Sequence, residues 1–242
     1  MSSEDLPAKP INPVNKPKKK HYDNFNSFIK KLAKTHQYNI RIDKNSIILL
    51  DSIIKEQCKK IINECQSLLT KPKSSRQTLS FIDVQAAVDL LYVPPDNRKY
   101  KDSIAGEIRS YAENARKQYL GYIANKSSLK NKERTPENLR KLAAKFKKNA
   151  NIILPFARMK VVVRYQFIKD NICRISDESI VCIVIAIQRI ISNILQSVIE
   201  IKKNLTITSK IINRAIRSDP LLAKIFSDSI IIDGGFMPSV DH

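Results

Sequence analysis

Apolar residues recur along most of the chain at steps of three and four positions, which places them on one face of an α-helix. The first stripe predicts a short helix that begins near Tyr22 and ends near His36. After a loop, the carboxylate of Asp43 can cap a second helix by accepting its first-turn amides. This second helix is long, because no glycine or proline interrupts the pattern over about 26 positions. Its apolar positions are Ile47, Leu50, Ile54, Cys58, Ile61, Ile62, Cys65 and Leu69.

A short third helix is expected after a basic loop over residues 71–78. Ser80 can cap this helix, and Pro94 ends it because proline disfavours the helical conformation in the residue before it. One further helix is expected over residues 102–125, where apolar side chains share one face. The first half is therefore expected to fold as short, long and short helices followed by one more.

The second half repeats this plan with little residue-by-residue identity. It predicts a short helix over about residues 158–168, a long helix over about 179–202 capped by Ser176 or Asp177, a short helix over 209–217 and a helical turn over 220–226. The β-branched run over residues 180–187 resembles a strand, but apolar positions continue at helical spacing to Val198, so length favours a helix. Between the halves, a basic linker over residues 126–151 is expected to contain one helix, starting at Thr135-Pro136. The whole pattern predicts an all-α protein.

The net charge of the chain indicates which class of ligand it binds. The chain has 43 Lys and Arg against 23 Asp and Glu, a net charge of +20. Such a surface attracts polyanions, because each cation that neutralises a phosphate releases a condensed counterion. The basic residues recur in loops rather than along one amphipathic face, which favours nucleic acid over a membrane. The alternative is a solvated surface that only maintains solubility. Residues 1–21, rich in proline and lysine, are expected to form a disordered basic tail.

Nothing in the composition indicates an enzyme, a metal site or a cofactor. The four glycines, Gly106, Gly121, Gly234 and Gly235, form no phosphate-binding loop. The three histidines are scattered, and the four cysteines form no CxxC pair, so we expect buried, reduced thiols and no small-molecule substrate. Residues 1–20 lack the apolar stretch of a signal peptide. The longest unbroken apolar run is also far shorter than the ~18 residues of a membrane span, so we expect a soluble, intracellular protein.

Particular segments make the chain resemble the histone fold. Residues 22–36 resemble the first helix of a 2B-type histone, and SFIDVQAAVDLL at residues 80–91 resembles its third helix. In the second half, LPFAR at residues 154–158 resembles the start of a 2A-type histone. AIRSD at residues 215–219, followed by GGFMP at 234–238, resembles the end of that family. The chain thus resembles a histone doublet, with 2B-type fused to 2A-type, an order best known from large DNA viruses of amoebae.

This resemblance implies two histone folds in one chain that clasp each other as an intramolecular handshake pseudo-heterodimer. The implied regions are a tail (1–21), a 2B-type fold with a C-terminal helix (22–125), a basic linker (126–151), a 2A-type fold (152–228) and a docking tail (229–242). The implied function is to wrap and compact double-stranded DNA in a nucleosome-like particle, together with 3-type and 4-type histones. The implied location is with DNA, in a viral particle, a viral factory or a nucleus. The alternative is a histone-fold transcription or architectural factor that does not wrap DNA.

In such a clasped pair, the first loop of one half lies beside the second loop of the other, and the two first helices lie together. Three DNA-binding surfaces result, and none of them reads bases. By position, the first would hold Arg41, Lys44, Lys202, Lys203 and Thr206, the second Lys73, Arg76, Thr78 and Arg174, and the central one Lys30, Arg158 and Arg164. The tail would bring Lys18, Lys19 and Lys20 close to DNA. Each residue could instead be a solvated surface charge.

The C-terminal segment is expected to dock onto the 3-type and 4-type partners, with Phe236 as an apolar anchor; a simple turn is the alternative. The docking residues would be Asp233, Gly234, Gly235, Phe236 and Met237. The chain also departs from the family. Thr206 stands where the family usually has an arginine, and Val161 replaces another basic residue, so both contacts should be weaker. The glutamates of the family's acidic patch are replaced, leaving Asp219, so we expect arginine-anchored ligands of that patch not to bind. The replacing residues are Gln188, Asn193, Gln196, Pro220 and Leu221.

Overall fold

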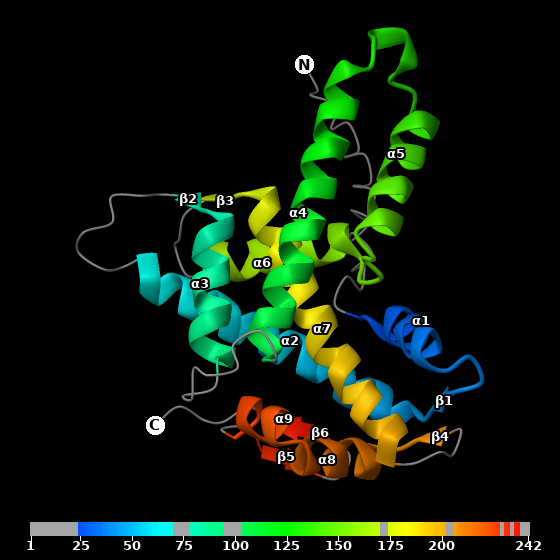
Figure 1. Ribbon diagram of the computed structural model, residues 1–242, viewed down its shortest axis with the longest axis vertical. Helices are drawn as coiled ribbons and strands as arrows, with labels where there is room; N and C mark the ends of the chain where they lie inside the picture. Colours follow the sequence, from blue (N-terminus) through cyan, green and yellow to red (C-terminus); the bar gives the residue numbers. More distant parts are fainter. Residues whose placement is uncertain are drawn as a thin grey trace, which may run out of the picture.

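The computed structural model describes residues 24–69, 78–93, 103–169, 174–201, 206–227, 230–232 and 235–237. Within these ranges the chain is mostly α-helical, and the few strand segments are two or three residues long (Figure 1). The predicted all-α class is therefore confirmed.

The first half contains the expected sequence of short, long and short helices followed by a further long helix. Its elements are α1 (Asn26–His36), β1 (Arg41–Ile42), α2 (Lys44–Leu69), β2 (Thr78–Leu79), α3 (Phe81–Tyr92) and α4 (Ile104–Ser128). The predicted caps are present, since Asp43 Oδ1 accepts a hydrogen bond from Ser46 N at 2.6 Å. Ser80 and Asp83 form a reciprocal capping box at the start of α3. α4 extends three residues beyond its predicted end.

The second half has the same order of helices. Its elements are η2 (Asn131–Glu133), α5 (Pro136–Asn149), α6 (Phe156–Lys169), β3 (Arg174–Ile175), α7 (Asp177–Ile201), β4 (Thr206–Ile207), α8 (Ser209–Ser218), α9 (Pro220–Ile225), β5 (Ile230–Ile232) and β6 (Gly235–Met237). Residues 180–187 are helical, as their spacing predicts. Of the two candidate caps for α7, Ser176 accepts from Ser179 N at 3.1 Å, whereas Asp177 binds Lys160.

Short parallel strand pairs join the two halves at both ends of the long helices. β1 pairs with β4, and β2 pairs with β3 (Figure 1). The registers are Arg41 with Thr206, Ile42 with Ile207, Thr78 with Arg174, and Leu79 with Ile175. In each pair, the strand before one half's long helix lies beside the strand that follows the other half's long helix.

The two strand pairs are built alike. At one end, the carbonyl of Ile207 accepts hydrogen bonds from Asp43 N at 3.1 Å and Ser46 Oγ at 3.2 Å. At the other, the carbonyl of Leu79 accepts from Ser176 N at 3.2 Å and Ser179 Oγ at 2.9 Å. A buried serine in the first turn of each long helix thus binds a strand of the opposite half, which fixes the register at both ends.

The halves share one hydrophobic core rather than having separate ones. The buried cluster draws side chains from all the helices α1 to α9, and α7 lies at its centre. Every residue of α7 from Ser179 to Gln188 is buried, and from there to Val198 only the face that carries Arg189, Asn193 and Gln196 is partly exposed. α7 is long and apolar enough to cross a membrane by composition, but 83% of its most apolar window is buried in the protein. Its apolarity is therefore accounted for by the core.

α5 was expected to be a helix within a linker, and its cap is confirmed because Thr135 Oγ1 accepts from Asn138 N at 3.2 Å. The structure adds that α5 folds back against α4 (Figure 1). Phe146 is only 5% exposed, and its ring centroid lies 5.5 Å from that of Tyr119 and 5.7 Å from that of Tyr122. The sequence did not indicate this contact. α5, at the C-terminal end of the expected linker, is thus packed against the folded body.

Replacing Phe146 with alanine should lower the free energy of unfolding by about 3 kcal/mol, the low end of the range for buried aromatic truncations. Amide hydrogens of α5 should also exchange faster, because the ring attaches α5 to α4 and to Phe156. Urea denaturation and hydrogen exchange measure the two effects. Phe146→Leu is the control and should cost less than about 1.5 kcal/mol. Equal stability of Phe146→Ala and the wild type would show that α5 is not held by this cluster.

Candidate nucleic-acid interface

The first expected surface lies at the β1–β4 pair, which we call the β1–β4 surface. Arg41 and Thr206 are exposed and directly opposite each other in the register. Lys44 is also exposed and is the first residue of α2. The unpaired amides and the dipole of a helix N-terminus favour an anion at such a place. The structure thus brings these three residues together. Lys202 and Lys203, expected on the same surface, lie outside the described residues.

The second expected surface lies at the β2–β3 pair, which we call the β2–β3 surface. Thr78 and Arg174 are exposed and opposite each other, so this surface repeats the arginine and threonine of the first in reversed order. Lys73 and Arg76 lie outside the described residues. The N-termini of α3 and α7 follow β2 and β3 directly. Each pair of strands therefore presents one arginine, one threonine and nearby helix N-termini.

Two carboxylates stand beside the β2–β3 surface at the start of α7, and neighbouring cations neutralise them. Asp177 accepts from Lys160 Nζ at 2.6 Å, and Arg164 Nη2 lies 3.5 Å from the same carboxylate. Glu178 pairs with Arg116 Nε at 2.5 Å. Burial acts to raise the pKa of Asp177, but the hydrogen bond and charge of Lys160, aided by Tyr119 and Arg164, hold the pKa below its usual value. Asp177 is thus ionised at neutral pH and compensates part of the local positive charge.

The central expected surface is smaller than predicted. Arg158 reaches from α6 to the start of α1, where its guanidinium donates to the carbonyl of Asn24 and lies 5.5 Å from the ring centroid of Phe28. Lys30 is exposed on α1. Arg164, however, is placed beside Asp177, immediately after β3. The structure therefore associates Arg164 with the β2–β3 surface instead of the central one, because an ion-pair partner from α7 determines its position.

The remaining predicted site residues belong to the N-terminal tail and the C-terminal segment. Lys18, Lys19, Lys20, Asp233 and Gly234 lie outside the described residues. Gly235, Phe236 and Met237 form β6, which pairs with β5 in an antiparallel hairpin. The backbone of β6 lies near α2 of the same chain. Docking of this segment onto another protein stays a prediction.

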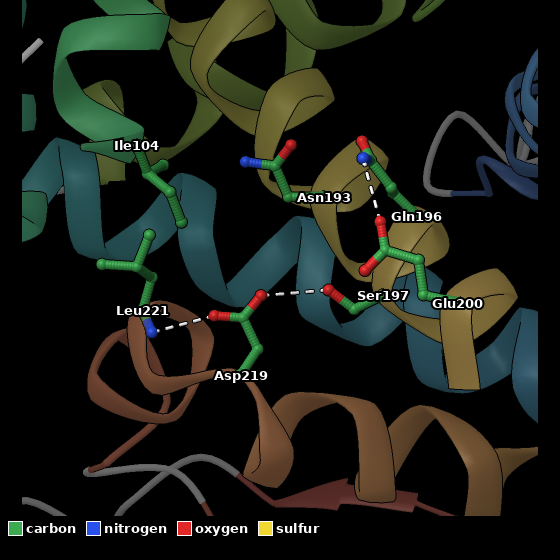
Figure 2. Close-up of a pocket in the computed structure, with 7 residues that line it drawn as sticks. All are labelled: Ile104, Asn193, Gln196, Ser197, Glu200, Asp219 and Leu221. Carbon is green, nitrogen blue, oxygen red and sulfur yellow. Dashed lines mark hydrogen bonds between the residues drawn. The ribbon is translucent and has the colours of Figure 1, made fainter. Parts of the chain in front are cut away.

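A shallow pocket of about 160 Å³ lies between the C-terminal part of α7, the start of α9 and the start of α4 (Figure 2). Its lining residues are Ile104, Asn193, Gln196, Ser197, Glu200, Asp219 and Leu221. Asn193, Gln196 and Leu221 are among the residues expected to replace an acidic patch, and Pro220 lines the adjoining hollow. Gln188, another of those residues, does not line the pocket. Its side chain is 4% exposed and binds the backbone of residues 151–154 instead of facing solvent.

The resemblance to histones left only Asp219 as a carboxylate in this patch. The pocket has a second carboxylate, because Glu200 lines it beside Asp219. Both carboxylates accept hydrogen bonds from neighbouring residues (Figure 2). Glu200 accepts from Gln196 Nε2 at 3.1 Å, and Asp219 accepts from Ser197 Oγ at 3.0 Å and Leu221 N at 2.9 Å. Asp219 thereby caps α9. The sequence could have placed Glu200 in this patch, because a residue four positions after Gln196 lies on the same face of the helix.

No cluster of three or more potential metal ligands occurs among the residues that the structure describes. Cys58, Cys65 and Cys182 are buried and free, as predicted, and Cys173 lies outside the described residues. Burial raises the pKa of the Cys58 and Cys182 thiols to about 12, and burial also raises the pKa of Cys65. These thiols are therefore protonated at neutral pH and unsuited to nucleophilic chemistry.

Cys58 and Cys182 should resist thiol reagents in the native protein. With each pKa at about 12, about one thiol in ten thousand is ionised at pH 8, and burial also blocks access. We expect both to remain unmodified by a thiol-reactive probe at pH 8 and to react after addition of denaturant, as mapped by mass spectrometry. Rapid native labelling of either residue would show that the shared core opens readily.

Comparison with known proteins adds no relative on which a function could be based. No protein-family model matches the chain, and no curated protein matches it. A functional assignment therefore depends on the paired strands, the shared core and the position of the charges.

Proposed function

We propose that the chain is a core-histone doublet, a 2B-type half fused to a 2A-type half, that wraps double-stranded DNA. The observation that carries this proposal is the reciprocal pairing of β1 with β4 and of β2 with β3. In each pair, the loop before one long helix lies beside the loop after the other, which is the arrangement implied by the handshake of two histone folds. The single core supports the same interpretation, because neither half covers α7 alone.

The spacing of the two paired-strand surfaces suits a curved duplex. They lie toward opposite ends of α2, whose 26 residues extend about 39 Å. One turn of B-DNA advances about 34–36 Å, so both surfaces can face the same side of a duplex at successive turns. Arginines can then enter the minor groove where it turns inward, while helix amides bind the adjacent phosphates. Contacts of this kind are independent of base sequence and strongly dependent on salt.

The proposed partners are 3-type and 4-type histones, themselves separate or fused. Two features support a further protein surface. β5 pairs with β6, which contains the described part of the GGFMP segment, Gly235–Met237. α3 exposes Ile82 (67%) and Leu90 (62%), large apolar side chains that a partner would cover. The alternative function, a histone-fold architectural factor, would use the same fold to hold DNA locally without wrapping it.

Reconstitution separates these two functions. Assembled with 3-type and 4-type histones on long DNA, the chain should protect a discrete fragment from nuclease, longer than the fragment protected by the 3-type and 4-type histones alone. That difference arises because wrapping covers successive helical turns. A local architectural factor would add no discrete length. The absence of any added protection across a range of protein ratios would rule out the doublet function.

Changing Arg41 and Arg174 together to alanine should weaken DNA binding without unfolding the protein, since both side chains are exposed at the ends of the shared core. The slope of log Kobs against log salt concentration should become shallower by about 2, at roughly 0.9 for each phosphate contact. The matched control, Lys210→Ala with Arg214→Ala, removes two exposed charges from α8. Equal slopes for the wild type and the Arg41/Arg174 variant would exclude these arginines as contacts.

A further inference from the structure

The C-terminal half of α4, η2 and α5 form a helical hairpin over residues 117–149, which we call the α4–α5 hairpin. In Figure 1 it extends beyond the rest of the described chain, with its tip far from the β1–β4 pair. The resemblance to histones covers neither η2 nor α5. The hairpin is therefore a feature that the proposed wrapping function does not use.

Contacts hold the hairpin together at both ends. At its tip, the guanidinium of Arg134 donates to the carbonyls of Leu129 at 3.2 Å and Ser127 at 3.3 Å. At its base, the aromatic cluster around Phe146 joins α5 to α4 and to the start of α6. A flexible linker between the halves would need none of these contacts. The structure instead holds α5 in a fixed orientation.

The turn that follows α5 is also fixed. Asn151 adopts a left-handed conformation (φ 52°), and Ile152 N donates to the carbonyl of Lys147 at 2.8 Å, which closes a Schellman-type cap. The buried amide of Gln188 then binds this turn, donating to the carbonyl of Asn151 at 2.7 Å and accepting from Ile153 N at 2.8 Å. α7 in the core thus anchors the end of α5.

The hairpin carries a concentrated positive charge. Residues 117–149 contain ten Lys and Arg and two Glu. While the apolar side of α5 faces α4, five cations occupy its exposed side. They are Arg140, Lys141, Lys145, Lys147 and Lys148. Lys141 pairs with Glu137 at 2.8 Å, and within the described part of the chain the other four form no ion pair. Exposed cations without an ion-pair partner, carried on one face of a packed helix, are suited to an anionic ligand.

The chemistry of this face selects the kind of anion. Apart from Ala144 it presents no apolar side chain, so it lacks the anchors of a membrane-surface helix or of a specific protein interface. It also lacks aromatic side chains, on which the bases of a single strand would stack. From Arg140 to Lys148 the helix rises about 12 Å, comparable to the width of the major groove between two phosphate rows. A DNA duplex fits these properties best.

We propose that the α4–α5 hairpin binds the phosphate backbone of a second duplex segment, separate from the duplex that lies over the β1–β4 and β2–β3 surfaces. The hairpin would connect the particle to DNA beyond the wrapped path or to a separate DNA molecule. The assignment depends on the charge and fixed packing of the hairpin; it rests on the proposed binding of a first duplex at the β1–β4 and β2–β3 surfaces but does not require that this duplex is wrapped.

The test is a two-duplex capture assay with the full-length chain. A biotinylated 20-base-pair duplex is immobilised, and capture of a second, fluorescent 20-base-pair duplex is measured. The variant Arg140→Gln, Lys145→Gln, Lys147→Gln, Lys148→Gln removes the unpaired cations while keeping good helix formers. The control Lys59→Gln, Lys210→Gln, Arg214→Gln, Arg217→Gln removes the same charge from exposed positions on α2 and α8. Circular dichroism checks that both variants keep the wild-type helix content.

We expect the wild type and the control to capture the fluorescent duplex, and the hairpin variant to capture at least tenfold less. The salt slope of the second binding step should become shallower by about 3 to 4 in that variant, at roughly 0.9 for each phosphate contact. Three outcomes would overturn the proposal. These are no capture by the wild type, undiminished capture by the hairpin variant, or an equal loss in the control.

Nuclease protection distinguishes a failure of this proposal from a failure of the wrapping function. A hairpin variant that protects a fragment of wild-type length but captures no second duplex supports a separate site. A shortened fragment would place the hairpin on the wrapped path and would overturn the proposal of a second segment. If the wild type protects no discrete fragment, the wrapping function fails while the capture result still decides the role of the hairpin.

Discussion

The burial of α7 is the interaction on which the rest of the structure depends. Apolar side chains occur on every side of its N-terminal half and on most sides of the rest, so it can be stable in water only if other helices surround it. Each large aliphatic side chain removed from water contributes about 1.5 to 3 kcal/mol. α1 to α3 of the first half and α6 and α8 of the second supply the cover, and α4 lies along α7 as well. The two halves are thereby committed to one shared core.

The shared core determines the positions of the charged residues at the two paired-strand surfaces. Once α2 and α7 are packed together, the strands at their ends must lie side by side, and buried Ser46 and Ser179 fix the pairing by binding strand carbonyls. Arg41 and Arg174 are then held at opposite ends of one body. Asp177 and Glu178 are paired with neighbouring cations, whereas Arg41 and Arg174 form no ion pair among the residues that the structure describes. The excess of 43 Lys and Arg over 23 Asp and Glu therefore leaves unpaired positive charge at the surface, which is the physical basis for expecting a polyanionic ligand.

The connection between the halves is itself part of the body. A covalent link makes the association of the two halves intramolecular, at an effective concentration of order mM for a flexible linker. Here α5 packs on α4 through Phe146, and Gln188 anchors the turn that leads into α6. The second half consequently begins at a fixed place on the first. A fixed α5 also has a fixed exposed face, and on that face the cations of the hairpin are gathered.

The sequence by itself determined the helices, their order and most of their ends, because periodicity and caps such as Asp43, Ser80 and Thr135 act within a few residues of chain. It also located Arg41, Thr78, Arg174 and Thr206 in loops. Only the tertiary structure decided which residues meet. Arg164 lies within ion-pair distance of Asp177, and Gln188 is buried against the turn after α5. Phe146 packs α5, which was expected to belong to a linker, against α4. Such contacts depend on the packing of segments far apart in the chain, which local spacing does not encode.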